Sequence, residues 1–430
     1  MEDILIRHEH NRIIIWSNKF KSYFCTINNE NECNLRKYLE GQKVSENFEK
    51  QCKELGLDGK RREIYSQNKL GLMSPLEYYF DFTSACNLRC RHCYNRFKLG
   101  HATMSTEQIK DIIVDMYNSG VMRLHLAGGE PTLFLPEMEM YLKTAQQYGI
   151  FTSMASNGTL ITNDLCSVLD KYQLFSITIS LEAANEKKNA VIRGAGSFSK
   201  AIAGINKLTS YKKIHDSSYI VGIKVSYDID FTQEDFEELI KLAIDLNVDI
   251  IKFANPERCI FHERGYYGKN SGKYYKNIDV VRELKNKYHD KIIITQINSP
   301  TNNCLPIGIP ETKGCIGAQE LIAIAPDGKI TPCLMNEYNL GNIKDYNSIK
   351  NLYLSEAIQE YYKLIKNYSC EQCEYHPQCR GGCQVRKFVE YGKIENIDPL
   401  CPLKYKSVQC KKYVYPLDKV FQKVSVLHSL

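Results

Sequence analysis

The sequence predicts an α/β fold built on a partial, open barrel of parallel strands. Between residues 76 and 297, six short apolar runs alternate with amphipathic helical patterns, which indicates consecutive βα units. A complete eight-unit barrel typically needs about 250 residues, more than this stretch provides. The prediction is therefore a partial (β/α)6 barrel, similar to a TIM barrel that lacks its last units.

A small α+β domain is predicted before the barrel, over residues 1–75. Two short strands flank a Ser-Asn-Lys turn, and two helical patterns follow, the second ending at Gly56. The predicted elements are strands at 13–16 and 23–27, helices at 32–39 and 45–55, and a loop at 57–62.

The barrel itself is expected over residues 76–300. Its strands are predicted at 76–83, 121–126, 150–155, 174–181, 219–227 and 250–254, with helices at 106–119, 136–148, 197–208, 231–246 and 280–288. A third domain is expected over residues 301–410, where Cys, Gly, Pro and Asn are frequent and long periodic elements are few. Its predicted elements are short strands at 321–325 and 329–331 and a helix at 349–368. So little apolar core implies that bound metal stabilises this domain. Residues 411–430 are predicted to form a C-terminal tail.

Composition narrows the class of protein. An apolar content of 43%, a charged content of 25% and a net charge of +6 are ordinary for a soluble globular protein. The basic residues are scattered, so no nucleic-acid partner is expected, and no apolar run is long enough for a membrane span. The first residues lack a secretory signal, so we expect a cytoplasmic protein whose thiols are reduced. Its 17 cysteines then indicate metal ligation rather than disulfides.

The first cysteine motif provides three thiolates, Cys86-x3-Cys90-x2-Cys93, directly after the first barrel strand. A cubane iron–sulfur cluster takes four ligands, so three cysteines would leave one iron open to a substrate or cofactor. The alternative, zinc, is usually bound by two pairs of ligands and rarely by such a triplet.

Other polar motifs follow the next strands. Gly128-Gly129-Glu130-Pro131 follows the second strand, Asn157 lies in a Ser-Asn-Gly-Thr segment after the third, and Ser180 ends the fourth. Parallel α/β folds place active sites at the carboxyl ends of their strands, so these motifs should converge on the cysteine loop.

The triplet, the tyrosine that follows it and the Gly-Gly-Glu-Pro motif together resemble the radical S-adenosylmethionine (SAM) superfamily. The resemblance implies that the three cysteines bind a [4Fe–4S] cluster and that SAM chelates its fourth iron. It also implies a set of cofactor-binding residues. These are Gly128, Gly129 and Glu130 at the SAM amino group, Ser180 near its ribose or carboxylate, Arg193 at its carboxylate, and Tyr94, Pro131 and Asn157 beside them. Ser180, Arg193 and Asn157 could instead be ordinary loop residues.

The second cysteine set resembles the seven-cysteine SPASM extension of radical SAM enzymes. Its members are Cys315, Cys333, Cys370, Cys373, Cys379, Cys383 and Cys401. A zinc ribbon would use four of these and leave the others without a role. The resemblance implies two auxiliary [4Fe–4S] clusters, one on Cys315, Cys333 and Cys383 and one on the other four, for a total of three clusters.

The first auxiliary cluster needs one more ligand, for which Cys304 is the first candidate and Cys259 a poorer one. If neither binds, a substrate thiolate could take that iron. Five remaining cysteines fit no ligand pattern and are expected to be small buried residues. They are Cys25, Cys33, Cys52, Cys166 and Cys410.

The resemblance implies an enzyme that reductively cleaves SAM to a 5′-deoxyadenosyl radical, with an electron donor such as flavodoxin or ferredoxin. The expected substrate is a ribosomally made, cysteine-rich precursor peptide that gains thioether cross-links. Residues 1–75 loosely resemble a leader-peptide recognition element, although a capping subdomain for the barrel is an equal alternative.

Other functions are considered beside this one. Oxidation or C–C cross-linking of a peptide or protein side chain is the alternative reaction. Sulfatase maturation is disfavoured because Leu334 stands where those enzymes carry a catalytic Asp. An iron–sulfur electron-transfer or zinc scaffold is the non-enzyme alternative. The catalytic base is unassigned, with Asp228, Glu257, Asp327 and Glu337 as unranked candidates.

Overall fold

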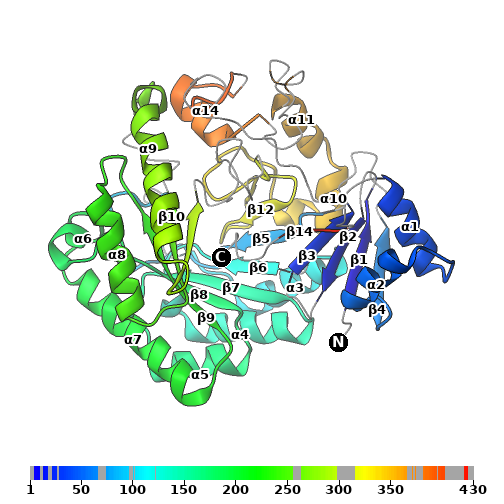
Figure 1. The fold of residues 1–430 in the computed structure, drawn as a ribbon, viewed down its shortest axis with the longest axis horizontal. Coiled ribbons are helices and arrows are strands. Elements are labelled where there is room, and N and C mark those ends of the chain that lie inside the picture. The colour runs from blue at the N-terminus through cyan, green and yellow to red at the C-terminus, as the bar shows by residue number, and fades with distance from the viewer. Residues whose placement is uncertain are drawn as a thin grey trace.

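The structure is a computed structural model, and it describes most of the chain. The described residues are 4–9, 13–17, 22–26, 29–65, 74–95, 100, 102–121, 123–254, 263–297, 315–365, 370, 373, 381–394, 396–401 and 421–424. They form a small N-terminal sheet domain, a large curved sheet with helices along its outer side, and a C-terminal part above that sheet (Figure 1).

The N-terminal domain is a five-stranded sheet that also takes in the end of the chain. Its elements are β1 (Ile4–His8), β2 (Ile13–Ser17), β3 (Ser22–Thr26), α1 (Asn29–Leu39), α2 (Glu46–Glu54) and β4 (Arg61–Tyr65), with β14 (Phe421–Val424) as the added strand. The strand order is β14-β3-β2-β1-β4, and only the β1–β4 pair is parallel. Two sequence predictions are wrong here: the loop predicted at 57–62 runs into β4, and residues 421–424 of the predicted tail form a strand.

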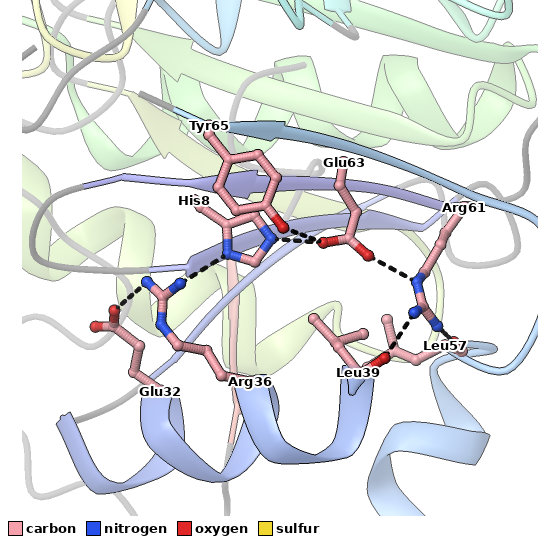
Figure 2. A network of polar contacts seen from close by, with 8 residues as sticks. All are labelled: His8, Glu32, Arg36, Leu39, Leu57, Arg61, Glu63 and Tyr65. Atoms are coloured by element: carbon pink, nitrogen blue, oxygen red, sulfur yellow. Dashed lines mark hydrogen bonds and ion pairs between the residues drawn. The ribbon is translucent and has the colours of Figure 1, made fainter. Parts of the chain in front are cut away.

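Polar contacts join β1, β4 and α1 on one side of this domain (Figure 2). The ring of His8 bonds Glu63 of β4 through Nε2, at 2.9 Å, and stacks on Tyr65 with ring centroids 4.2 Å apart. Its Nδ1 is 3.4 Å from Arg36 Nη1 of α1. Because these contacts connect three elements, they fix β4 beside β1.

The large sheet has nine strands in the order β11-β10-β9-β8-β7-β6-β5-β12-β13. Its barrel elements are β5 (Glu77–Phe80), α3 (Thr106–Asn118), β6 (Arg123–Leu126), η1 (Pro131–Leu133), α4 (Leu135–Gln147), β7 (Phe151–Ser156), α5 (Asn163–Lys171), β8 (Ser176–Ser180), α6 (Glu186–Arg193), α7 (Ser197–His215), β9 (Ile220–Ser226), α8 (Gln233–Asp245), β10 (Ile250–Ala254), α9 (Tyr266–Lys287) and β11 (Ile293–Ile297). Strands β5 to β11 are parallel, which confirms the predicted α/β class. The seventh parallel strand, β11, was not predicted.

Alternate residues of each barrel strand face opposite sides of the sheet. One set packs with the helices in the main hydrophobic core, as Leu124, Val225 and Phe253 do. The other set, which includes His125 and Lys252, faces the inner side of the curved sheet. The helices therefore cover the outer side and leave polar strand residues on the inner side.

The C-terminal part extends the same sheet. Its elements are β12 (Leu321–Ile324), β13 (Ile330–Thr331), η2 (Ile343–Asp345), α10 (Ile349–Leu354), α11 (Glu356–Ile365) and α14 (Gln384–Tyr391). Strand β12 pairs in parallel with β5, so the predicted hairpin belongs to the barrel sheet. The single helix predicted at 349–368 is interrupted at Ser355, which separates α10 from α11.

The N-terminal sheet packs on the amino-terminal ends of the barrel strands. Trp16 and its apolar neighbours contact Leu76 before β5, Phe151 at the start of β7 and Phe175 before β8. Arg7 is 1% exposed and donates to the backbone oxygens of Pro75, Gly120 and Ser74. The predicted polar motifs lie at the other end of these strands.

Candidate active site

The three cysteines of the first motif lie in the loop between β5 and α3. Arg91 N donates to Ile192 O of α6 at 2.8 Å, which holds this loop against the end of the fourth barrel unit. Cys86, Cys90 and Cys93 are partly buried free thiols, and Leu88 N donates to Cys86 Sγ at 3.4 Å. Burial raises the pKa of Cys93 to about 11, so the thiolate form needs a nearby positive charge.

Three partly buried thiols in one loop fit an iron–sulfur cluster whose fourth iron is left open. Among the residues that the structure describes, no group of three His, Cys, Asp or Glu side chains is placed to hold one metal ion. In a cubane cluster each thiolate binds a different iron, so the three sulfurs of one loop need not converge on one point. The iron atoms would also supply the positive charge that the buried thiolates need.

The Gly-Gly-Glu segment after β6 packs directly on the cysteine loop. Gly129 N donates to Thr83 O at 3.0 Å, and Glu130 N donates to Ala85 O at 2.7 Å. A Cβ atom added to Gly129 would stand 1.9 Å from Ala85 O, and Gly128 has a φ of +106°. Position 129 therefore requires glycine, because its backbone closely approaches Ala85, the residue before Cys86. The predicted contact with the SAM amino group stays a prediction.

The carboxylate of Glu130 joins the β6 and β7 loops. The side chain is 1% exposed, and its Oε1 accepts from Thr132 N, Thr132 Oγ1 and Ser156 Oγ. Its Oε2 accepts from Asn157 N at 2.7 Å. Burial raises the pKa of Glu130, and these donors oppose the rise. With four donors on its oxygens, Glu130 positions loops in this structure.

Asn157 connects the β7 loop to the cysteine loop. Its Nδ2 donates to Asn87 Oδ1 at 2.7 Å, and Asn87 Nδ2 donates to Thr159 Oγ1 at 2.9 Å. Asn87 directly follows Cys86, so this pair of amides sets the position of the first cysteine. The role of Asn87 was not predicted, although a polar residue inside the triplet was a usable signal.

A buried carboxylate, Glu182, organises the charges beside the second cysteine. Arg193 donates to Glu182 Oε1 through Nη2 at 2.6 Å and Nε at 3.0 Å, and His92 Nε2 lies 3.1 Å from the same oxygen. Arg193 Nη1 is 3.9 Å from Cys90 Sγ. Although burial alone would raise the pKa of Glu182, Arg193 and His92 lower it. The predicted SAM-binding arginine therefore stands at the cluster loop, oriented by Glu182.

The remaining predicted cofactor residues lie around the same loop. Ser180 ends β8 and pairs with Lys224 of β9, while Pro131 is buried at the start of η1. Tyr94 packs against a hydrophobic cluster that contains Cys315, Cys333 and Cys383. The first cysteine motif thus contacts the core of the C-terminal part.

The same cluster brings together the three cysteines assigned to the first auxiliary cluster. Cys315, Cys333 and Cys383 are all buried in it, together with Tyr79 of β5 and Leu321 of β12. Burial and the neighbouring thiols raise the pKa of Cys333. Three adjacent buried thiols at the inner side of the sheet would suit a metal cluster, and their assignment to the first auxiliary cluster stays a prediction.

A buried ion pair links the two auxiliary groups. Asp398 accepts from Arg386 Nε at 2.7 Å and from Arg386 Nη2 at 2.6 Å. It also accepts from Cys383 N at 2.7 Å, and its carbonyl accepts from Cys401 N at 2.9 Å. Asp398 therefore positions a cysteine of each proposed cluster, Cys383 through its carboxylate and Cys401 through its backbone carbonyl.

Cys370, which belongs to the second auxiliary group, lies near the buried Lys387. Cys373 N donates to Cys370 O at 3.0 Å, and the pKa of Cys370 is raised by burial and lowered by the charge of Lys387. Lys387 is 0% exposed, and its Nζ has no hydrogen-bond partner among the residues described. A buried ammonium needs a counter-charge, which a thiolate-bound cluster would provide.

Several residues that the sequence suggested as ligands or bases are either not described by the structure or exposed. Cys304, Cys379 and the alternative Cys259 lie outside the described residues, as does Glu257. The other candidate bases, Asp228, Asp327 and Glu337, are exposed. The structure therefore does not select a base from these four.

Comparison with protein families identifies two domains. Residues 80–243 match the radical SAM superfamily, and residues 315–383 match the iron–sulfur cluster-binding SPASM domain. The chain therefore contains a radical SAM domain followed by a SPASM domain and is an enzyme, which confirms the resemblance seen in its cysteine motifs. No helix of the described residues is long and apolar enough to cross a bilayer.

Similar proteins act in several maturation reactions. Mycofactocin maturase MftC of Mycolicibacterium smegmatis is 24% identical over 79% of this chain and 85% of its own length. The PqqA peptide cyclase of Bradyrhizobium diazoefficiens is 22% identical over 76% and 86%. A cysteine-type anaerobic sulfatase-maturating enzyme of Clostridium novyi is 24% identical over 74% and 90%.

Solved structures show the same fold. Streptococcus suis SuiB bound to the precursor peptide SuiA has a TM-score of 0.67 and 18% identity, covering 93% of this chain and 99% of that one. The enzyme anSMEcpe with bound AdoMet has a TM-score of 0.58 and 21% identity, covering 77% of this chain and 95% of that one.

Proposed function

We propose that this enzyme uses SAM and three [4Fe–4S] clusters to modify a ribosomally made precursor peptide. The observation that carries the proposal is the three-thiol loop at the carboxyl ends of the barrel strands. Gly129, Glu130 and Asn157 hold it there, and two further groups of cysteines lie in the SPASM domain. When bound, a reduced cluster would supply the electron that cleaves SAM into methionine and a 5′-deoxyadenosyl radical.

The residues of the chain position the reactants. Cys86, Cys90 and Cys93 would hold three irons and leave the fourth to SAM. Arg193, oriented by Glu182, presents a guanidinium beside this loop, where it can pair with the SAM carboxylate. The Gly-Gly segment would place backbone oxygens at the SAM amino group.

A peptide substrate is supported by the N-terminal sheet. Strand β3 pairs with β14, the edge strand of this sheet, in antiparallel register, with Phe421 opposite Thr26 and Val424 opposite Tyr23. This edge can thus bind an extended segment by strand addition, which is how many peptides are recognised. A precursor segment would take the place of β14. The PqqA peptide cyclase and the SuiA-bound SuiB are relatives that act on or bind peptides.

Within this class we propose thioether formation in a cysteine-rich precursor. Such a precursor offers thiolates, and a ligand-deficient auxiliary cluster on Cys315, Cys333 and Cys383 would give one of them an iron to bind. Oxidation or C–C cross-linking is the alternative reaction. Sulfatase maturation is disfavoured because Leu334 has no proton-accepting group. This side chain packs against the hydrophobic cluster that contains Cys315.

The enzyme assignment is tested by reconstituting the clusters anaerobically and adding dithionite and SAM. We expect 5′-deoxyadenosine from the wild type and none above background from Cys86→Ala. Cys373→Ala should cleave SAM but form no peptide product. If the wild type yields no 5′-deoxyadenosine, the enzyme assignment is wrong.

The peptide assignment is tested by co-expression with any small cysteine-rich reading frame beside the gene. Loss of two mass units per thioether is the expected result, because each bond removes two hydrogens. A chain that ends at residue 420 lacks β14, so it should bind the precursor more tightly. Unchanged precursor mass would contradict the peptide assignment, and unchanged affinity would contradict the use of the β3 edge.

A further inference from the structure

The inner side of the curved sheet carries an excess of buried cations. Lys224 of β9 and Lys252 of β10 both alternate with residues of the outer core, so they face the inner side. Lys252 is 1% exposed and Arg123 of β6 is 6% exposed on the same side, whereas Lys224 is half-buried. Charged residues inside barrel strands are rare, and lysine is almost never fully buried without a partner.

The nearby carboxylates are already paired. Glu77 forms an ion pair with Arg123 at 2.8 Å, and Glu182 is paired with Arg193. Within the described part of the chain, the side-chain ammonium of neither Lys224 nor Lys252 makes a hydrogen bond or an ion pair, although both backbones are paired in the sheet. Burial, with the charges of Lys224 and Arg123, holds the pKa of Lys252 well below its ordinary value. The charges of Glu182 and Glu77 reach Lys224 and Lys252, respectively, but both carboxylates are held by arginines, so neither lysine has a direct ion-pair partner among the described residues.

Strand register places the two lysines side by side. Lys252 is paired with Lys224, and Lys224 is paired with Ser180, the residue that ends β8. Neighbouring strands lie about 4.8 Å apart, so two lysines in register can contact one small anion. Ser180 adds a hydroxyl donor at the same level. These three residues form one row near the carboxyl ends of the strands, where the cysteine loop also lies.

We propose that Lys224 and Lys252 bind a carboxylate of the substrate peptide, either an Asp or Glu side chain or the C-terminal carboxylate. The proposal rests on the proposed function, because it names the residue class that a peptide substrate presents at the radical site. A carboxylate between two ammonium groups would gain two charge-assisted hydrogen bonds. It would also offset the cost of burying the unpaired Lys252 next to the half-buried Lys224.

The SAM carboxylate is a less suitable ligand for this pair. In the proposed complex it already binds iron and lies beside Arg193. Lys252 stands two strands beyond Ser180, about 10 Å across the sheet, and farther still from the Gly-Gly-Glu segment on the β6 side. The pair therefore lies beyond the expected SAM site in the order of the strands.

The first test measures binding of small probes to the cluster-loaded enzyme by saturation-transfer NMR. N-acetylglutamate amide represents a side-chain carboxylate, N-acetylalanine a C-terminal carboxylate and N-acetylglutamine amide the neutral control. We expect one carboxylate probe to bind the wild type at least tenfold more tightly than Lys252→Met or Lys224→Met. The probe that binds identifies the source of the carboxylate.

Matched measurements separate this proposal from its alternatives. Lys53→Met changes an exposed lysine on α2 and should bind the probes as the wild type does. SAM affinity, measured by equilibrium dialysis, should change less than threefold in Lys252→Met. The same variant should unfold at a temperature equal to or above that of the wild type, because it removes an unpaired buried charge.

Four results would overturn the proposal. These are equal probe binding in wild type and lysine variants, tighter binding of inorganic phosphate than of either carboxylate, a tenfold loss of SAM affinity in Lys252→Met, and a clear fall in its unfolding temperature. The last would indicate that the chain itself provides a counter-charge. A failure of the proposed function appears elsewhere, as absent 5′-deoxyadenosine or unmodified precursor.

Discussion

At the scale of single residues, the cluster loop depends on backbone approach as much as on its cysteines. Gly129 leaves no room for a side chain against Ala85. We expect Gly129→Ala to destabilise the fold by about 1–3 kcal/mol, because the added methyl group must displace the loop that carries Cys86. Iron content after reconstitution should fall with it. Both are measured on purified protein, by denaturant unfolding and by iron analysis.

A second glycine provides the control. Gly272 lies in α9 with open space around it, so Gly272→Ala should stabilise the protein by about 0.5–1 kcal/mol and leave iron content unchanged. Equal iron content in both variants would show that the Gly129 contact does not position the cluster loop.

Lys387 should tune the proposed second auxiliary cluster. Reduction adds negative charge, and a buried ammonium near Cys370 favours the reduced state. Lys387→Met should therefore lower the reduction potential by on the order of 50 mV, close to a tenfold change for one electron. Lys387→Arg keeps the charge and should keep the potential. A redox titration followed by EPR measures both, and equal potentials in wild type and Lys387→Met would contradict the prediction.

Some features of the site could be predicted from the sequence, whereas others depend on the tertiary structure. The resemblance to the SPASM extension implied that Cys315, Cys333 and Cys383 lie together, and these three residues share one buried hydrophobic cluster. The pairing of Lys224 with Lys252 could not be predicted, because it depends on the register of two strands joined by a long helix. A lysine within an apolar strand was nevertheless a signal that could have identified each residue singly.

At the scale of elements, the errors occur where tertiary contacts override local signals. Residues 57–62 contain an Asp-Gly turn signal, yet Arg61 begins β4 because that strand pairs with β1. Helix α9 begins fourteen residues before its predicted start, since Gly268 and Gly272 obscure the pattern of its first half. Six of the seven parallel strands β5 to β11 were predicted because each is an apolar run buried by helices, and only β11 was missed.

The contacts between β1, β4 and α1 should weaken in acid (Figure 2). Burial lowers the pKa of His8 below its ordinary 6.5, so the unfolded state binds more protons below about pH 6.5. The free energy of unfolding must then decrease as the pH decreases, by at most about 1.4 kcal/mol per pH unit. Although burial alone would raise the pKa of Glu63, its hydrogen bonds with His8, Tyr65 and Arg61 lower it. Its effect has the same sign and begins near pH 4.5.

Amide hydrogen exchange of β1 and β4, corrected for intrinsic rates, measures this effect at pH 7.5 and 5.5. The wild type should lose protection at the lower pH, whereas His8→Gln should show nearly equal protection at both. A wild type with equal protection at the two pH values would contradict the assigned role of His8.

At the scale of the whole molecule, the N-terminal sheet and the cluster loop lie at opposite ends of the barrel strands. A strand such as β7, with six residues, spans about 20 Å. A precursor bound on β3 must cross at least that distance, which takes about six extended residues. Such a route works only if the N-terminal domain keeps a fixed position on the barrel, and this depends on its docking contacts.

Arg7 is the polar centre of that docking, so Arg7→Met tests it. The change leaves Glu9 buried without its 2.6 Å ion pair and removes donors from three carbonyl oxygens. We expect the free energy of unfolding to fall by about 3–5 kcal/mol and, in calorimetry, an early transition as the N-terminal sheet detaches.

Arg282→Met is the control, because it breaks only an exposed pair with Asp279 and should cost less than about 1 kcal/mol. Since strand addition on β3 does not use Arg7, the variant should still bind a precursor below its first transition but modify it slowly. Unfolding of Arg7→Met and Arg282→Met at the same temperature would show that apolar contacts alone fix the domain.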